Sequence, residues 1–259
     1  MLSLKNQQSA YMTLQDFAKG DKHSVIIEGP KQCGKTQMAR EYASMLGIKD
    51  FQIVKPTVNE LREVIDSCSQ IENNIVLCIE NLDNGVVAAS YTMLKFLEEP
   101  RTNTYIVITC SSCYRLPDTI ISRSHIATIN PPTIDDIHAV ANSRGVNLNS
   151  SSEKLRACCK NFADIDIVSK LDREKVDYLD TLASDSTWRD SVSNIVWKLG
   201  HWADNTEAPL AFVIHYLMNN MKSNIVYQAG CKCLQDLDDN TLGTHLTLSK
   251  FAYECKYIE

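Results

Sequence analysis

The chain has 259 residues, of which 44% are apolar and 22% are charged, as in an ordinary globular protein of one to three domains. Its formal net charge of −6 excludes a general attraction to nucleic acid, so any DNA contact has to come from a local patch or from partner subunits. No apolar run reaches the roughly 18–20 residues of a membrane helix, and residues 1–8 are too polar for a signal peptide. We therefore expect a cytoplasmic protein with no membrane partner.

Residues 24–36 predict a buried strand, a glycine-rich turn and the start of a helix. The turn fits the phosphate-binding loop pattern of Gly, four free positions and Gly-Lys-Ser/Thr. Glycines let the backbone wrap closely around phosphates, and the dipole of the following helix, expected over 36–46, faces them. We expect Lys35 to reach the β- and γ-phosphates of ATP and the Thr36 hydroxyl to bind Mg²⁺; the alternative is a chance match in a loop. The expected phosphate-binding residues are Gly29, Pro30, Lys31, Gln32, Cys33, Gly34, Lys35 and Thr36.

The chain up to about residue 132 alternates strands with helices. Its strands are apolar runs without strict alternation, which predicts a parallel sheet covered on both faces and hence an α/β domain. The expected strands after the first are 51–54, 75–80, 104–109 and 125–129, and the expected helices are 13–19, 58–71, 86–98 and 118–122. Thr57 to Glu60 can form a capping box at the start of one of these helices.

After Pro132 the pattern becomes helical. Short helices are expected at 133–144, 151–162 and 164–171, and the chain is helical throughout from about residue 180. Residues 209–221 are strongly apolar, and helices at 225–237 and 240–257 complete a predicted bundle.

The ten cysteines do not indicate a disulfide framework, because several of them lie in predicted buried helices and strands. Cys110 and Cys113 form a lone CxxC pair. A zinc or redox role needs a second ligand pair or a redox-motif context, and neither is visible, so we interpret both thiols as structural.

Glu80 closes a predicted apolar strand. A carboxylate at this point is the usual second Mg²⁺-binding element of a phosphate-loop ATPase, either directly or through water; the alternative is a solvated acid at a strand end. The next residue is Asn81, where many such hydrolases carry a glutamate. Asn81 can position a water molecule but cannot accept its proton.

Two further motifs give a specific resemblance. The segment Leu94-Lys95-Phe96-Leu97-Glu98-Glu99-Pro100 resembles the LLK-x-LEEPP motif of bacterial sliding-clamp loader subunits, of the DNA polymerase III gamma/tau and delta-prime type. The segment from Arg115 to Ser124, RLPDTIISRS, is similar to the K-L-P-x-T-I-x-S-R-C segment of that family. The order and spacing of the motifs also match, and the similarity covers roughly residues 24–132.

The resemblance implies an AAA+ architecture with a phosphate-loop ATPase core and a parallel sheet. The core would occupy 1–132, a small helical lid 133–178, and an all-α collar that holds a pentameric ring 179–259. It implies ATP and Mg²⁺ as ligands. The implied partners are other clamp-loader subunits, a sliding clamp, and primer-template DNA inside the assembly.

The resemblance also assigns roles to single residues. Glu80 takes the place of the Walker B aspartate of the family, and Ser111 aligns with the sensor 1 position that detects the γ-phosphate. Arg123 would be an arginine finger that acts in trans on ATP bound in a neighbouring subunit. Without the resemblance, Arg123 would be interpreted as a surface arginine. The resulting catalytic set is Lys35, Glu80, Asn81, Ser111 and Arg123.

The chain departs from the family pattern at three positions. Asn81 replaces the catalytic glutamate, Ser124 replaces the cysteine of Ser-Arg-Cys, and Asp166 stands where a sensor 2 arginine is expected. An acid close to the γ-phosphate would repel it. The zinc-binding insertion of cellular homologues is also missing, which suggests a divergent, phage-encoded subunit.

Three functions remain open at this point. The first is an ATPase subunit that opens and loads a ring clamp on primer-template DNA. The second, motivated by Asn81 and Asp166, is a non-hydrolysing structural subunit of such a loader that donates Arg123 to a neighbour. The third is an unrelated AAA+ ATPase or a small-molecule phosphotransferase, for which no acceptor site is recognisable.

Overall fold

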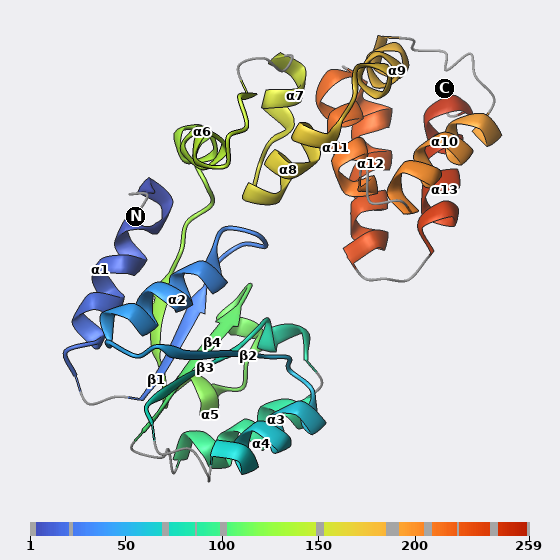
Figure 1. Cartoon of the computed structure of the whole chain (residues 1–259). Helices are drawn as coiled ribbons and strands as arrows, with labels where there is room; N and C mark the ends of the chain where they lie inside the picture. The colour runs from blue at the N-terminus through green and yellow to red at the C-terminus, as the bar shows by residue number, and fades with distance from the viewer. Residues whose placement is uncertain are drawn as a thin grey trace. The chain divides into compact units, whose positions relative to one another are not determined.

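The computed structural model describes residues 4–20, 23–68, 73–85, 87–98, 103–148, 153–184, 192–204, 209–221, 223–238 and 243–257. The chain folds into two compact units, 1–139 and 140–259, which are coloured blue to green and green to red in Figure 1. The boundary between the units falls within α6 (Ile134–Ser143).

The N-terminal unit is built on one five-stranded sheet in which every pairing is parallel. The strands follow the order β2-β3-β4-β1-β5. Because all strands run the same way, the loops after their carboxyl ends meet at one edge of the sheet. The strands are β1 (Ser24–Glu28), β2 (Asp50–Val54), β3 (Ile75–Ile79), β4 (Thr104–Cys110) and β5 (His125–Thr128).

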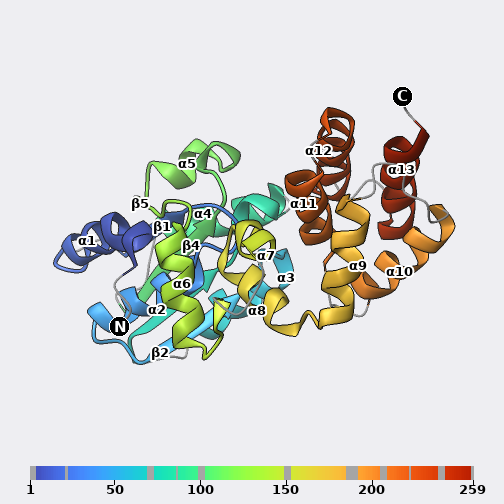
Figure 2. The same cartoon turned by 90° about the horizontal axis from the view of Figure 1, so that it is seen from above.

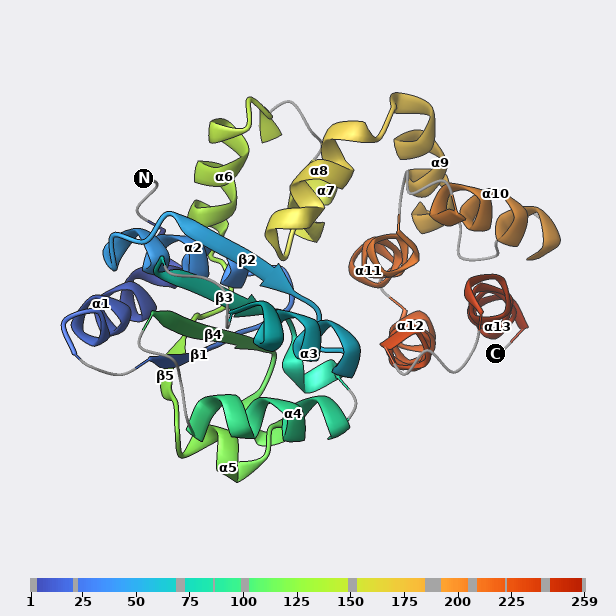
Figure 3. The ribbon, with the colours of Figure 1, turned by 60° about the horizontal axis from the view of Figure 1, so that its bottom comes forward.

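Helices cover both faces of this sheet, as Figure 3 shows. Successive strand residues point to opposite faces, so Val25 and Ile27 pack towards α1 and α2, whereas Ile26 packs on the opposite side. The first face carries α1 (Gln8–Phe17) and α2 (Lys35–Met45), and the second carries α3 (Val58–Ser67), α4 (Val87–Glu98) and α5 (Asp118–Ile121). The predicted α/β layering is therefore confirmed.

The first helix differs from the prediction. The sequence pattern predicts a helix at 13–19, whereas the structure has a 3₁₀ turn η1 (Lys5–Gln7) followed directly by α1. The polar residues Asn6 and Gln7 are only 2% and 7% exposed, because their side-chain amides donate to backbone carbonyls far along the chain. An apolar periodicity cannot reveal burial of this kind.

The predicted capping box at the start of α3 is half formed. The Thr57 hydroxyl accepts a hydrogen bond from the Glu60 N–H at 3.4 Å. The Glu60 carboxylate accepts from the Lys55 N–H at 2.9 Å instead of from Thr57. The N–H of Thr57 donates to the Lys55 carbonyl, so it already has an acceptor and does not bond to Glu60.

The C-terminal unit consists of helices in the residues that the structure describes. α11 packs against α7, α9 and α12, while α13 packs against α10 and α12, and Figure 2 shows α9 beside α11. The apolar segment predicted at 209–221 is the buried centre of this unit, as α11. The helices are α7 (Glu153–Cys158), α8 (Phe162–Lys170), α9 (Arg173–Ser184), α10 (Val192–Asp204), α11 (Leu210–Asn220), α12 (Asn224–Asp238) and α13 (Thr244–Tyr257).

The division of the helical part into a lid and a collar stays a prediction, and its boundary at 178/179 lies inside the unbroken helix α9. None of the described helices is long and apolar enough to cross a membrane. Several predicted positions lie outside the described residues: Glu99 and Pro100 of the LEEP segment, 69–71, 86, 151, 152 and 240–242.

Candidate nucleotide site

The phosphate loop lies between β1 and α2, as predicted. A side chain at Gly29 would place its Cβ 2.9 Å from the Cys33 sulfur and 2.9 Å from the Ile129 carbonyl oxygen, so no larger residue fits. Gly34 has a φ of 97°, in the left-handed region that glycine adopts without strain. Both glycines of the pattern are thus required by the backbone. α2 begins at Lys35, so the positive end of its dipole faces the loop.

Lys35 turns back over this loop. It is 7% exposed, and its Nζ donates to the carbonyl oxygens of Gly29 at 2.8 Å and Pro30 at 2.7 Å. An ammonium group carries three donors, so one N–H is left for a phosphate oxygen. The arrangement keeps the charge inside the turn that the sequence predicts to hold phosphate.

Thr36 and Glu80 meet although they come from different elements. Thr36 lies in the first turn of α2, and Glu80 follows β3 directly. The Thr36 hydroxyl donates a hydrogen bond to Glu80 Oε1 at 2.5 Å. Hydroxyl and carboxylate oxygens are ligands that Mg²⁺ accepts, usually together with phosphate and water. In the described part of the chain, no three His, Cys, Asp or Glu residues gather as a metal cage. The two oxygens of this pair fit a magnesium ion whose other ligands come from nucleotide and water.

Asn81 continues the chain from Glu80 in an unusual conformation. Its φ is 49°, and its N–H donates to the Thr109 hydroxyl at 2.9 Å. Asparagine is one of the few non-glycine residues that adopts this left-handed region readily. Its side chain is exposed at the sheet edge that carries the phosphate loop. The structure thus gives a conformational reason for an asparagine here.

Ser111 follows β4 at the same edge. Its N–H donates to Asp83 Oδ2 at 2.9 Å, and the N–H of Cys113 donates to Glu28 Oε1 at 2.8 Å, so two carboxylates hold the turn. The Ser111 hydroxyl and Asp83 Oδ1 are buried without a partner among the described residues. A buried polar group without a partner costs about 1–3 kcal/mol, which favours a further ligand or water beside the predicted sensor.

Sequence reasoning missed Glu28 and Asp83 as the residues that hold the turn after β4. The available signal was that Glu28 ends the strand before the glycine turn, at the edge where the predicted site residues other than Arg123 converge. Both carboxylates hold the turn after β4 in place.

Cys110 and Cys113 lie next to this turn with their sulfurs 3.8 Å apart. Burial raises the pKa of both thiols, and the neighbouring Glu28 raises that of Cys113 further. Both thiols are therefore protonated at neutral pH, which favours the structural interpretation over metal binding.

Arg123 lies away from the other predicted site residues. It precedes β5, and the next residue, Ser124, shares a hydrogen bond of 2.8 Å with Ser24 at the first position of β1. Arg123 is therefore at the amino ends of the strands, whereas the phosphate loop follows their carboxyl ends. The five residues of β1, at about 3.3 Å each, separate the two edges by about 16 Å.

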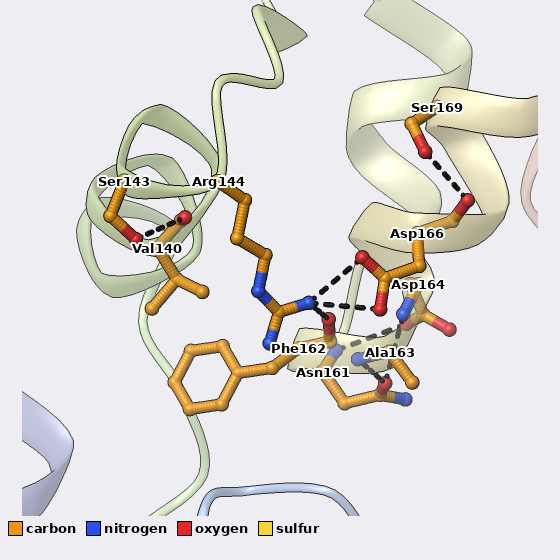
Figure 4. A network of polar contacts seen from close by, with 9 residues as sticks. All are labelled: Val140, Ser143, Arg144, Asn161, Phe162, Ala163, Asp164, Asp166 and Ser169. Carbon is orange, nitrogen blue, oxygen red and sulfur yellow. Dashed lines mark hydrogen bonds and ion pairs between the residues drawn. The ribbon is translucent and has the colours of Figure 1, made fainter.

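The segment expected to carry sensor 2 lies in the C-terminal unit. Asp164 forms a capping box with Asn161 at the start of α8. Figure 4 shows Arg144 pointing at Asp166, with Nη1 at 3.0 and 2.9 Å from the two carboxylate oxygens and 3.0 Å from the Phe162 carbonyl oxygen. The charge of Asp166 is thus paired inside this unit.

The chain is similar in sequence to known proteins. The family described as DNA polymerase III, delta subunit, matches residues 48–133. DNA polymerase III subunit delta' of Haemophilus influenzae is 27% identical over 123 residues, which are 44% of this chain. The chain spans 38% of the length of that curated relative.

Two solved structures from Thermotoga maritima have the same fold. A gamma subunit-related protein of DNA polymerase III matches with a TM-score of 0.60 and 14% identity, over 95% of this chain and 98% of its own. The RuvB Holliday junction branch migration motor matches with a TM-score of 0.53 and 14% identity, over 78% and 76%.

The parallel sheet, the phosphate loop between β1 and α2 and these structures define an AAA+ fold. The sequence matches are to subunits of DNA polymerase III, delta and delta', and a gamma subunit-related protein shares the fold, so the chain resembles clamp-loader-type subunits. The resemblance inferred from the motifs is thereby confirmed.

Proposed function

We propose that the chain is an ATP- and Mg²⁺-binding subunit of a cytoplasmic sliding-clamp loader, working beside other loader subunits on a ring clamp and primer-template DNA. One observation carries this proposal. The phosphate loop with Thr36 and Glu80 occupies one edge of the sheet, and Arg123 occupies the opposite edge.

The separation of these two edges favours an assembly of several subunits. Arg123 is too far from its own phosphate loop to act there, because the length of β1 lies between them. In a ring of such subunits, the sheet edge of one subunit that carries Arg123 can face the sheet edge of the next subunit that carries the phosphate loop. A guanidinium supplied in this way neutralises charge on the transferring phosphoryl group.

At the loop edge, each residue has a distinct role. The backbone N–H groups after Gly29 and the ammonium of Lys35 bind phosphate oxygens, while Thr36 and Glu80 hold the cation. ATP with Mg²⁺ supplies the γ-phosphoryl group for transfer to water. Ser111 would turn its buried hydroxyl towards that phosphate.

Asn81 favours a second candidate, in which the subunit binds ATP without hydrolysing it and serves its neighbours through Arg123. An amide cannot accept a proton from water, and of the nearby Asp83 carboxylate one oxygen accepts from the N–H of Ser111 while the other is buried. Both candidates require nucleotide binding, and they differ in turnover at this site.

The first experiment is equilibrium binding of a fluorescent ATP analogue with Mg²⁺ to the full chain. We expect Lys35→Ala to weaken binding at least about tenfold, as for loss of a charged hydrogen bond. Lys49→Ala is the control, because Lys49 is an exposed lysine beyond α2. Wild-type protein that fails to bind at millimolar ATP with Mg²⁺ contradicts both candidates.

The second experiment measures ATP turnover of the assembly with and without clamp and primed DNA. Arg123→Ala should lower turnover by about 10³-fold or more if it acts in trans, whereas Arg62→Ala, on exposed α3 surface, should not. Turnover that depends on Lys35 supports the hydrolysing candidate. Turnover that survives Arg123→Ala contradicts the finger.

A further inference from the structure

Glu98 of the LEEP segment contacts Arg123 of the Ser-Arg segment. Glu98 is the last residue of α4, and its Oε1 accepts a hydrogen bond from Arg123 Nη2 at 2.8 Å. The two residues are 25 positions apart, and the side-chain exposures are 51% for Glu98 and 36% for Arg123. Two motifs that the sequence singles out separately therefore form one ion pair.

Arg123 is also fixed from other directions. Its Nη1 donates to the carbonyl of Thr119, within α5, at 2.8 Å, and the backbone N–H of Arg123 donates to the Ile120 carbonyl. The Ser24–Ser124 hydrogen bond anchors the adjoining backbone to β1. The base of the side chain is thus held next to β1, while the Thr119 carbonyl and the Glu98 carboxylate each bind one end nitrogen of its tip.

The ion pair leaves the guanidinium able to bind another anion. A guanidinium has five N–H donors, and the contacts with Glu98 and Thr119 use two of them. Glu98 binds the guanidinium through one oxygen and not in the bidentate manner that would use two parallel N–H donors. Donors remain for a phosphoryl oxygen while the side chain is already ordered.

We infer that Glu98 is a positioning residue for Arg123, holding the guanidinium in the orientation in which it is presented to a neighbouring nucleotide. The inference rests on the proposed role of Arg123 as a finger in trans. An arginine side chain that is ordered before assembly loses less conformational entropy when it binds the transferring phosphoryl group.

The contact itself is tested on the full chain alone. Phenylglyoxal modifies arginine side chains, and mass spectrometry of the digest gives a rate for each position. Glu98→Ala should raise the rate at Arg123 by about two- to fivefold, the effect expected from loss of an exposed ion pair. Glu98→Gln keeps an acceptor oxygen and should lie between Glu98→Ala and wild type. Equal rates at Arg123 in all three proteins overturn the inference.

A matched control removes a nearby charge without touching the pair. Asp118→Asn lies in the first turn of α5, and Asp118 is not among the hydrogen-bond partners of Arg123. It should leave the rate at Arg123 unchanged. Arg62 and Arg115, both exposed, give internal reference rates in every digest. A rise at these references as well would mean general loosening and would contradict a specific contact.

The positioning role is tested by turnover of the assembly. Glu98→Ala should lower kcat by about threefold or more at unchanged KM for ATP, Glu98→Gln should restore most of it, and neither should matter in an Arg123→Ala background. A rise in kcat for both Glu98 variants would mean that the carboxylate sequesters Arg123, which overturns the inference. Absence of turnover in wild type counts against the hydrolysing function, while the modification rates still decide whether Glu98 holds Arg123.

Discussion

Arg144 and Asp166 form an ion pair between the end of α6 and α8, with Nη1 within 3.0 Å of both carboxylate oxygens. The same nitrogen donates to the Phe162 carbonyl in the first turn of α8. Asp166 stands where the clamp-loader resemblance places an arginine. The chain instead carries an arginine 22 residues earlier, and that arginine neutralises the acid.

This pair predicts a measurable coupling. Arg144→Gln and Asp166→Asn should each lower the free energy of unfolding by about 0.2–1 kcal/mol, because both side chains are partly exposed. The double variant should lose less than the sum, since either change alone breaks the same contact. Urea unfolding of the four proteins measures the difference.

Measurements of ATP affinity distinguish an Asp166 that is paired with Arg144 from an Asp166 that repels the γ-phosphate, as the sequence predicts. If the charge of Asp166 is paired with Arg144, Asp166→Asn should leave ATP affinity within about twofold. A tenfold tighter ATP complex in Asp166→Asn would show that the acid repels the γ-phosphate after all.

Local features of the sequence were enough to predict the sheet and the glycine turn between β1 and α2. Apolar strand runs report burial on both faces, and the spacing of Gly29 and Gly34 reports a backbone that only glycine fits. Thr36 and Glu80, each expected from its motif to bind Mg²⁺, are 2.5 Å apart.

The features that sequence reasoning missed depend on partners far apart in the chain. Ser124 stands where the family pattern has a cysteine, and its hydroxyl shares a hydrogen bond with Ser24, 100 residues away. The burial of Asn6, the turn-holding role of Glu28 and the pairing of Arg144 have the same origin. The pattern of polar residues along the sequence does not indicate which distant residue each of them contacts.

Asn81→Glu should increase ATP turnover at this site, because a carboxylate can accept the proton of the attacking water. General-base catalysis contributes about 10²–10⁴-fold when well positioned. The gain should come with a loss of about 1–2 kcal/mol of stability, since glutamate is disfavoured at the left-handed φ of 49°. Steady-state turnover and thermal unfolding measure the two effects.

Asn81→Gly is the matched control. Glycine adopts this conformation freely, so the variant should keep or slightly raise stability without any gain in turnover. Equal turnover in Asn81→Glu and wild type would show that the missing carboxylate is not what limits hydrolysis.

Asp136 anchors the N-terminal segment to the start of α6. This 2% exposed carboxylate accepts from the N–H groups of Lys5 at 2.6 Å, Asn6 at 3.2 Å and Thr133 at 2.9 Å, and from the Thr133 hydroxyl at 2.6 Å. Burial alone would raise its pKa, but these hydrogen bonds lower the pKa below its usual value. The stabilising effect is thus present above pH 3.8 and is lost as the pH falls through the lowered pKa.

Asp136→Ala should therefore lower the free energy of unfolding by about 2–4 kcal/mol at pH 7, because it leaves buried donors without an acceptor. The neighbouring Asp135→Ala is the control: that side chain is 74% exposed and pairs with the Lys5 ammonium on the surface. Its loss should cost less than about 1 kcal/mol. Similar losses in both variants, measured by urea unfolding, would contradict the anchoring role.

His215 makes stability depend on pH near neutrality. It lies half-buried on α11, where burial lowers its pKa below 6.5 while the Asp164 carboxylate opposes that shift. The unfolded chain therefore takes up a proton at a higher pH than the folded chain does. Stability should be fully present above about pH 6.5 and should fall as the pH drops through the folded pKa, by at most about 1.4 kcal/mol per pH unit.

Urea unfolding between pH 7.5 and 5.5 tests this sign. His215→Gln should remove the decline, because glutamine does not titrate. Asp164→Asn removes the charge that favours protonated His215 but keeps an acceptor oxygen for the capping box of α8, so its decline should continue to lower pH than in wild type. A stability that rises as the pH falls through this window, and loses that rise in His215→Gln, would mean that the folded chain favours the charged imidazole.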